Sequence, residues 1–118
     1  MHRAAEARAK EVLRYVIERL ECDDDIRVAS EISSADTLDE LGYVVTREDL
    51  VAIYNQARPA LDVATAGLPG AIDYLVSGGL SPASIVRWLD SAEGIDVIGH
   101  RTTSAELIAL LRHGRLAS

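Results

Sequence analysis

The segment from Gly78 to Asp90 contains the clearest helix start in the chain, and it limits most strongly what the chain can fold into. Ser81 is a preferred N-cap residue, and Pro82 suits the first helical position, where no N–H group is needed. Apolar residues then recur at helical spacing, at Ile85, Trp88, Leu89 and Ala92. We therefore predict a helix that begins near Ser81 and holds Trp88 in the core.

A second short helix is predicted immediately upstream, from Pro69 to Val76, because the pair Gly78 and Gly79 follows it. Two short helices joined by a glycine-containing turn of about three or four residues form the outline of a helix-turn-helix. This outline is a prediction about the fold of the C-terminal half. Function has to be argued from the residues of the site.

Capping residues and glycines divide the rest of the chain into further short helices. An amphipathic helix is expected over residues 4–20, and one of the aspartates that follow it is expected to cap the next element. Capping boxes at Thr46 and Thr103 predict two more helix starts. Short helical stretches are expected over residues 36–42, with Asp36 as cap, and over residues 60–66.

Two segments are ambiguous. Residues 26–35 fit a short helix or an irregular segment, and residues 95–98, which follow the interruption at Gly94, fit a small strand or an extended linker. With these alternatives open, we predict an all-α fold, a compact bundle of five to seven short helices. The 118 residues suit a single domain, with an acidic helical half (1–66) and a helix-turn-helix-like half (67–118).

Cysteine content and hydropathy bear on the compartment. Cys22 is the only cysteine, which excludes an intrachain disulfide and a cysteine-based metal cluster and favours a reducing compartment. No apolar run approaches the length of a transmembrane helix, and the N-terminus lacks the apolar core of a signal peptide. We expect a soluble, cytoplasmic protein that does not enter a membrane.

The net charge of −7 is unevenly distributed. Residues 1–66 hold 14 acidic and 8 basic residues, whereas residues 67–118 hold 5 and 4. An acidic chain repels nucleic acid at long range, because phosphate contacts dominate affinity. The charge therefore argues against DNA binding by the whole chain, and less against DNA binding by its second half.

The sequence contains no recognised catalytic motif: GxSxG, HExxH, the P-loop and GxGxxG are all missing. Of the three histidines only His100, in a predicted turn, is well placed for chemistry, and nothing in the sequence brings Cys22 beside it. The acidic run at 23–25 lacks the ligand spacing and the glycine of an EF-hand. We expect no enzyme activity, no metal and no cofactor.

Three groups of residues, at 87–89, 99–102 and 106–108, resemble the C-terminal segment of Xre/MbcA/ParS-type antitoxins. That segment has a Trp-Leu pair, a Gly-x-Arg-Thr turn and a leucine-rich helix. The resemblance covers roughly residues 70–115, with a longer interval between Trp88 and Gly99 than in the family. The same residues resemble MerR or excisionase-like regulators, with residues 99–101 as a reduced wing. These families bind DNA, toxins or both, so the resemblance implies a DNA or protein partner.

A second resemblance concerns the first half. Residues 16–20 and 37–42 are similar to acyl carrier proteins, as are residues 71–75 to the start of their last helix. That family carries its phosphopantetheine on a serine soon after a Leu-Gly pair. Here Tyr43-Val44-Val45 follow Leu41-Gly42, without a serine. A carrier-like scaffold is therefore the weakest of the functional hypotheses.

The predicted DNA-binding residues are Ser81, Ser84, Arg87 and Arg101. Small residues on the outer face of a helix from Ser81 would let it enter a major groove, where Arg87 would reach a guanine edge or a phosphate. Arg101 would hold a phosphate. The alternative is that Ser81 is only a cap and Arg87 only a surface arginine.

Two functional hypotheses follow. The first is a helix-turn-helix-type regulatory or antitoxin-like protein that binds DNA, a protein partner or a second copy of itself. The alternative is a non-enzymatic interaction module whose acidic helical surface serves a basic partner without DNA. A basic patch that joins Arg87, Arg101, Arg112 and Arg115 would favour DNA, and a uniformly acidic surface would favour the module.

Overall fold

The computed structural model describes residues 11, 13–14, 17–18, 21, 24–42, 44–58 and 67–117, with side chains described up to residue 113. Over these residues the chain forms seven helices and no strand, which confirms the predicted all-α bundle. In chain order the helices are α2 (Asp25–Ile32), α3 (Ala35–Leu41), α4 (Arg47–Ala57), α5 (Gly67–Ser77), α6 (Pro82–Leu89), α7 (Ala92–Ile98) and α8 (Ser104–Ala117).

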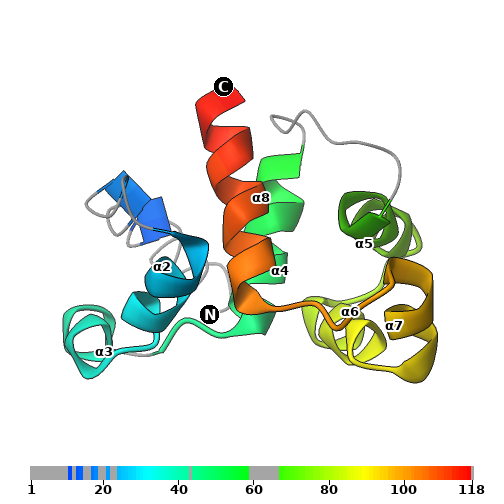
Figure 1. Ribbon diagram of the computed structural model, residues 1–118, viewed down its shortest axis with the longest axis horizontal. Coiled ribbons are helices and arrows are strands. Elements are labelled where there is room, and N and C mark those ends of the chain that lie inside the picture. The colour runs from blue at the N-terminus through cyan, green and yellow to red at the C-terminus, as the bar shows by residue number, and fades with distance from the viewer. Residues whose placement is uncertain are drawn as a thin grey trace.

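Helices α4 and α8 form a central pair, side by side and running in the same direction (Figure 1). Helices α2 and α3 lie on one side of this pair, where α2 packs against α8. Helices α5, α6 and α7 lie on the other side, where α6 packs against α4. We call residues 24–42, which contain α2 and α3, the N-terminal lobe, and residues 67–99, which contain α5 to α7, the C-terminal lobe.

The predicted helix starts are confirmed by their hydrogen bonds. At α6, the Ser81 Oγ accepts from the Ser84 N–H at 3.3 Å. At α4, Thr46 and Asp49 form the reciprocal bonds of a capping box. At α8, the Thr103 and Glu106 side chains each accept the other's backbone N–H, at 3.2 and 3.1 Å. These starts follow from local sequence because each cap needs only residues three positions apart.

The caps of the N-terminal lobe were predicted in part. Asp24 caps α2 by accepting the Arg27 N–H at 2.8 Å, as expected for one of the aspartates, and the ambiguous segment 26–35 is helical as far as Ile32. The cap of α3 was assigned wrongly to Asp36. Ser34 caps α3 instead, because its Oγ accepts the Thr37 N–H, and Asp36 lies in the first turn.

The prediction of a small strand or linker over residues 95–98 is wrong, because these residues belong to α7. Ser91 caps this helix by accepting the Gly94 N–H at 3.0 Å, and Gly99 ends it in the left-handed conformation at φ 98°. Ile98 packs against the core. Packing of the buried side overrides the weak helix propensity of β-branched residues.

Gly94 does not interrupt the chain as predicted, but is buried inside α7. A Cβ atom at this position would lie 2.1 Å from the Trp88 carbonyl oxygen. Only a residue without a side chain lets the start of α7 pass this close to the end of α6. The turn at Asp90 and Ser91 therefore folds α7 tightly back on α6.

One core joins all the helices. Its fully buried residues include Val28 and Ile32 of α2, Leu50 and Tyr54 of α4, Ile72 of α5, Ile85 and Leu89 of α6, and Leu107 and Ile108 of α8. Trp88, predicted to be buried, is only partly buried and packs against the edge of this core. Its position between the buried Ile85 and Leu89 and the exposed Arg87 leaves part of the indole in solvent.

Some predictions fall on residues outside those described. The helix expected over 4–20 is described only at a few positions, of which Leu13 and Ile17 are buried in the core. The stretch at 60–66 and Cys22 are not described. None of the helices described here has the length and apolar character to cross a membrane.

Candidate functional site

The two predicted serines lie together at the start of α6. The Ser81 hydroxyl donates to the Ser84 Oγ at 3.1 Å and also accepts the Ser84 N–H. This arrangement stabilises the first turn of α6 without any ligand. The role of Ser81 as a cap is therefore shown, whereas DNA contact by either serine stays a prediction.

Arg87 lies on the outer face of α6, in its last turn. Ile85 and Leu89 are buried against the rest of the core, and α6 packs on α4, so the helix presents Arg87 to solvent. Arg87 makes no ion pair within the described residues.

Arg101 lies in the segment that connects α7 to α8, and it too is exposed without an ion pair in the described part of the chain. The neighbouring Thr102 is almost completely buried, which anchors this segment. His100 contacts the Glu106 carboxylate at 2.5 Å, so two residues of the segment are held beside the start of α8. The structure brings Ser81 to Ser84, but no contact joins Arg87 or Arg101 to them within the described residues.

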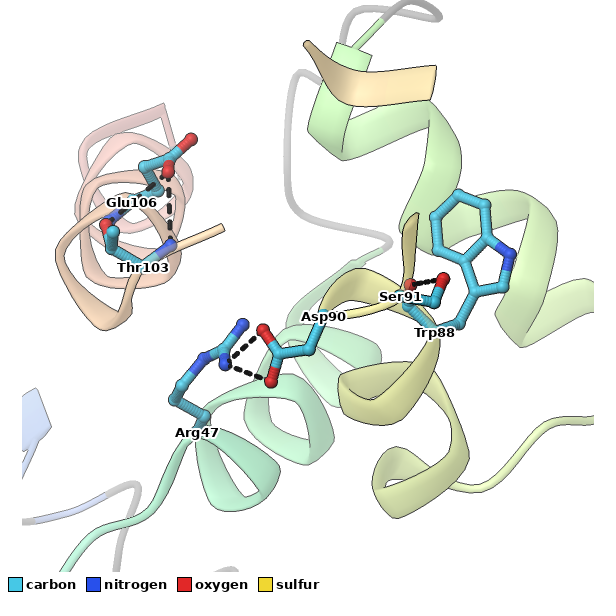
Figure 2. A network of polar contacts seen from close by, with 6 residues as sticks. All are labelled: Arg47, Trp88, Asp90, Ser91, Thr103 and Glu106. Atoms are coloured by element: carbon cyan, nitrogen blue, oxygen red, sulfur yellow. Dashed lines mark hydrogen bonds and ion pairs between the residues drawn. The ribbon is translucent and has the colours of Figure 1, made fainter. Parts of the chain in front are cut away.

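Acidic side chains surround the two arginines in the sequence. Glu93 and Asp96 are exposed on α7, while Asp90 follows α6 directly. Figure 2 shows Asp90 engaged with Arg47 of α4, whose Nη1 donates to both carboxylate oxygens at 2.8 Å. This ion pair links the turn between α6 and α7 to the start of α4. No local pattern in the sequence predicts it.

The expected basic patch is not formed by Arg112. Its guanidinium donates to Asp25 at 2.7 Å and to the Glu21 carbonyl oxygen at 2.9 Å, so it joins α8 to the N-terminal lobe. The side chain of Arg115 lies outside the described residues. Of the four arginines that were to form the patch, only Arg87 and Arg101 are both described and exposed without an ion pair.

The described residues were also compared with the requirements of metal and catalytic sites. Within the described ranges no group of three or more metal-ligating side chains occurs. His100 has Glu106 as its partner, and Cys22 lies outside the described residues.

A shallow groove between α2 and the start of α8 was also missed. Its lining is Ile26, Ala29 and Ser30 of α2, the C-cap residue Ser33, and residues 103–106. The first four of these positions have the spacing i, i+3, i+4 and i+7 of one helix face. This spacing was visible in the sequence, but the partner helix was not.

No family model, curated protein or solved structure matches this chain. The resemblances to antitoxins, regulators and carrier proteins therefore stay predictions.

Proposed function

We propose that this chain is a non-enzymatic regulatory interaction module, which binds a basic protein partner through its acidic helical surface. The observation that carries this proposal is the distribution of free charge. Three arginines form ion pairs with carboxylates: Arg47 with Asp90, Arg58 with Asp73 and Arg112 with Asp25. In contrast, the acidic residues of α3 stand in solvent without ion pairs in the described part of the chain: Asp36, Asp39 and Glu40.

Three carboxylates on a helix of seven residues produce a concentrated negative potential. Such a potential attracts a basic partner at long range and orients it before contact. Asp36 in the first turn favours the helix dipole, whereas Asp39 and Glu40 lie near the C-terminal end of α3, where negative charge opposes the dipole. No cation of the described residues neutralises these charges, and a basic partner would do so.

The regulatory part of the proposal is supported by the C-terminal lobe. Short turns join α5 to α6 and α6 to α7, which keeps the helix-turn-helix resemblance open. Antitoxin-like regulators combine such a unit with protein binding, and protein binding is the part of their function that we propose for this chain. We place its action in the cytoplasm, because the single cysteine suits a reducing compartment.

Affinity capture from the native host with matched charge variants tests this proposal. The test variant replaces the α3 carboxylates, as Asp36→Asn, Asp39→Asn and Glu40→Gln. The control replaces exposed carboxylates of the other lobe, as Glu93→Gln and Asp96→Asn. A protein captured by the wild type and the control, but lost with the α3 variant and in high salt, supports the proposal. A partner that all three chains retain equally would contradict it.

DNA binding through α6 is the second candidate. The specific observation that favours it is the exposure of Arg87 and Arg101 without ion pairs among the described residues. The exposed acidic residues of α7 oppose it. A salt titration of DNA binding with both arginines replaced by alanine decides between the candidates.

A further inference from the structure

The groove between α2 and α8 has a floor of small side chains. Ala29 and Ser30 come from α2, Ser33 is the C-cap of that helix, and Ser104 and Ala105 come from the first turn of α8. Small residues let the backbone of another element approach closely, whereas long side chains would hold it away. The two helices lie next to each other, with α2 at the side of the central pair (Figure 1).

Ile26 stands at the edge of this groove and is 70% exposed. Val28 and Ile32 of the same helix are fully buried in the core. Helix α2 therefore has one apolar side in the core and a second apolar position, Ile26 with Ala29, on the groove. An apolar partner side chain that covers Ile26 would remove this surface from water, which is favourable.

The charge around the groove selects the kind of partner. Residues 24–49 contain eight acidic residues and two basic ones. Of these, Arg47 is paired with Asp90 and Asp25 with Arg112, so the segment keeps an excess of acidic residues. Glu106 of the groove lining is paired with His100. A second copy of this chain would bring the same acidic surface to the contact, and like charges would oppose it. A cationic segment is complementary.

We propose that the groove between α2 and α8 binds an amphipathic helix of a basic partner. The apolar face of that helix covers Ile26 and Ala29, and its lysine or arginine side chains lie toward the carboxylates of the N-terminal lobe. This is the helix-in-groove mode of recognition, in which apolar residues at helical spacing anchor the ligand. The inference rests on the proposed function, because it names the site and the segment that the basic partner uses.

The probe for this site is a synthetic leucine–lysine peptide of about 18 residues, or about five turns, with leucines at i, i+3, i+4 and i+7. A scrambled peptide of the same composition keeps the charge but has no apolar face. Both are titrated into the ¹⁵N-labelled full chain. The expected result is that the patterned peptide shifts the amide signals of Ala29, Ser30, Ser33 and Ala105 and binds at least about tenfold more tightly than the scrambled one.

Two variants with matched exposure locate the contact. Ile26→Ser removes the apolar side chain from the groove, and Val97→Ser removes one that is 61% exposed on α7 in the other lobe. Ile26→Ser should weaken the patterned peptide about tenfold or more, and Val97→Ser less than about twofold. Neither change touches the core, so both chains should keep the wild-type unfolding midpoint.

Several results would overturn the groove assignment. Equal affinities for both peptides, equal effects of the two variants, or no binding at low salt would each refute it. Concentration-dependent dimerisation lost with Ile26→Ser would assign the groove to a second copy instead. If the α3 charge variant loses the captured partner while Ile26→Ser retains it, the groove inference fails and the proposed function stands. If the α3 charge variant and Ile26→Ser both retain the captured partner, the groove inference and the proposed function both fail.

Discussion

At the scale of single residues, Tyr54 is the side chain whose surroundings set a measurable pH response. Its ring is completely buried in α4, and its hydroxyl donates weakly to the Pro69 carbonyl oxygen and to Asp73, each at 3.4 Å. Burial is the main cause that raises the pKa of Tyr54 above its ordinary value, and the negative charge of Asp73 adds to it. The phenol therefore stays protonated in the folded chain where a free tyrosine ionises.

This shift predicts a loss of stability in alkali. Above pH about 10 the unfolded chain ionises Tyr54 while the folded chain keeps the proton, so the free energy of unfolding falls as pH rises. Between pH about 9 and about 11, the Tyr54→Phe variant should lose about 1.4 kcal/mol less than the wild type. Urea denaturation at both pH values measures the difference.

Tyr74 supplies the control for this measurement, because its ring is 79% exposed on α5. Tyr74→Phe should follow the wild type across the same pH range. If Tyr54→Phe also follows the wild type, the Tyr54 hydroxyl is not buried in the folded chain as the structure places it.

Residue-scale features could be predicted from the sequence where they depend on near neighbours. The caps at Ser81, Thr46 and Thr103 need only residues within one helical turn, and all three were found. The pairing of Arg112 with Asp25 joins residues 87 positions apart, so no local pattern reveals it. The partial exposure of Trp88 likewise depends on how α6 is rotated against the rest of the core.

At the scale of elements, α6 and α7 approach each other closely at Gly94. Gly94→Ala would place a methyl group 2.1 Å from the Trp88 carbonyl oxygen, which is backbone and cannot rotate away. The helices would have to separate, and we expect a loss of about 1–3 kcal/mol or more, as for other overpacked sites. Thermal and urea unfolding measure this loss.

The neighbouring residue gives a matched comparison. Glu93 lies in the same helix turn, and its side chain is exposed. The free energy of unfolding of Glu93→Ala should therefore stay within about 0.5 kcal/mol of the wild type. If Gly94→Ala is as stable as Glu93→Ala, α7 must lie farther from α6. The sequence alone predicts a break at Gly94, because a glycine that permits close packing and one that ends a helix look the same without the neighbouring helix.

The ion pair between Arg47 and Asp90 links two elements that no local pattern connects. The Arg47 Nε and Nη2 atoms are buried and have no hydrogen-bond partner, so Asp90 is the main compensation for this charge in the described residues. Asp90→Asn should therefore destabilise the chain by about 1 kcal/mol, because the Asp90 carboxylate is 38% exposed and solvent screens the pair. Asp96→Asn, on an exposed part of α7, should have little effect.

A double variant shows whether the loss comes from the unpaired arginine. The double variant Arg47→Met with Asp90→Asn also removes the Arg47 charge. It should therefore be less destabilised than the single variant Asp90→Asn. Additive losses would mean that the two side chains do not depend on each other. Chemical denaturation of Arg47→Met, Asp90→Asn and the double variant at one pH completes the double-mutant cycle.

At the scale of the whole molecule, the two lobes pack on either side of the central α4–α8 pair (Figure 1). The class of the fold could be predicted, since helix starts and stops are written into the sequence and the described residues contain no strand. The surface features of the molecule could not be predicted from the sequence. The groove forms between residues 26–33 and 103–106, and the separation of free acids from paired arginines depends on contacts between distant helices.

Affinity for DNA separates the two candidate functions. The chain has a net charge of −7, and three of its arginines are committed to internal ion pairs. Phosphate contacts supply most of the affinity for DNA, so two exposed arginines beside exposed carboxylates supply little. We expect the chain to release DNA fragments from the region upstream of its gene even in about 50 mM salt, where such contacts are strongest.

A DNA-binding protein would behave differently in the same titration. If α6 enters a major groove, Arg87→Ala should lose about 1–3 kcal/mol on one preferred sequence, because it removes a contact to a base. Arg101→Ala should weaken all sequences alike and reduce the salt slope by about 1, because it removes a phosphate contact. Glu93→Gln on α7 should then strengthen binding, because it removes a charge that repels phosphate. Retention of DNA by the wild type with this pattern of variants would replace the interaction module by a DNA-binding regulator.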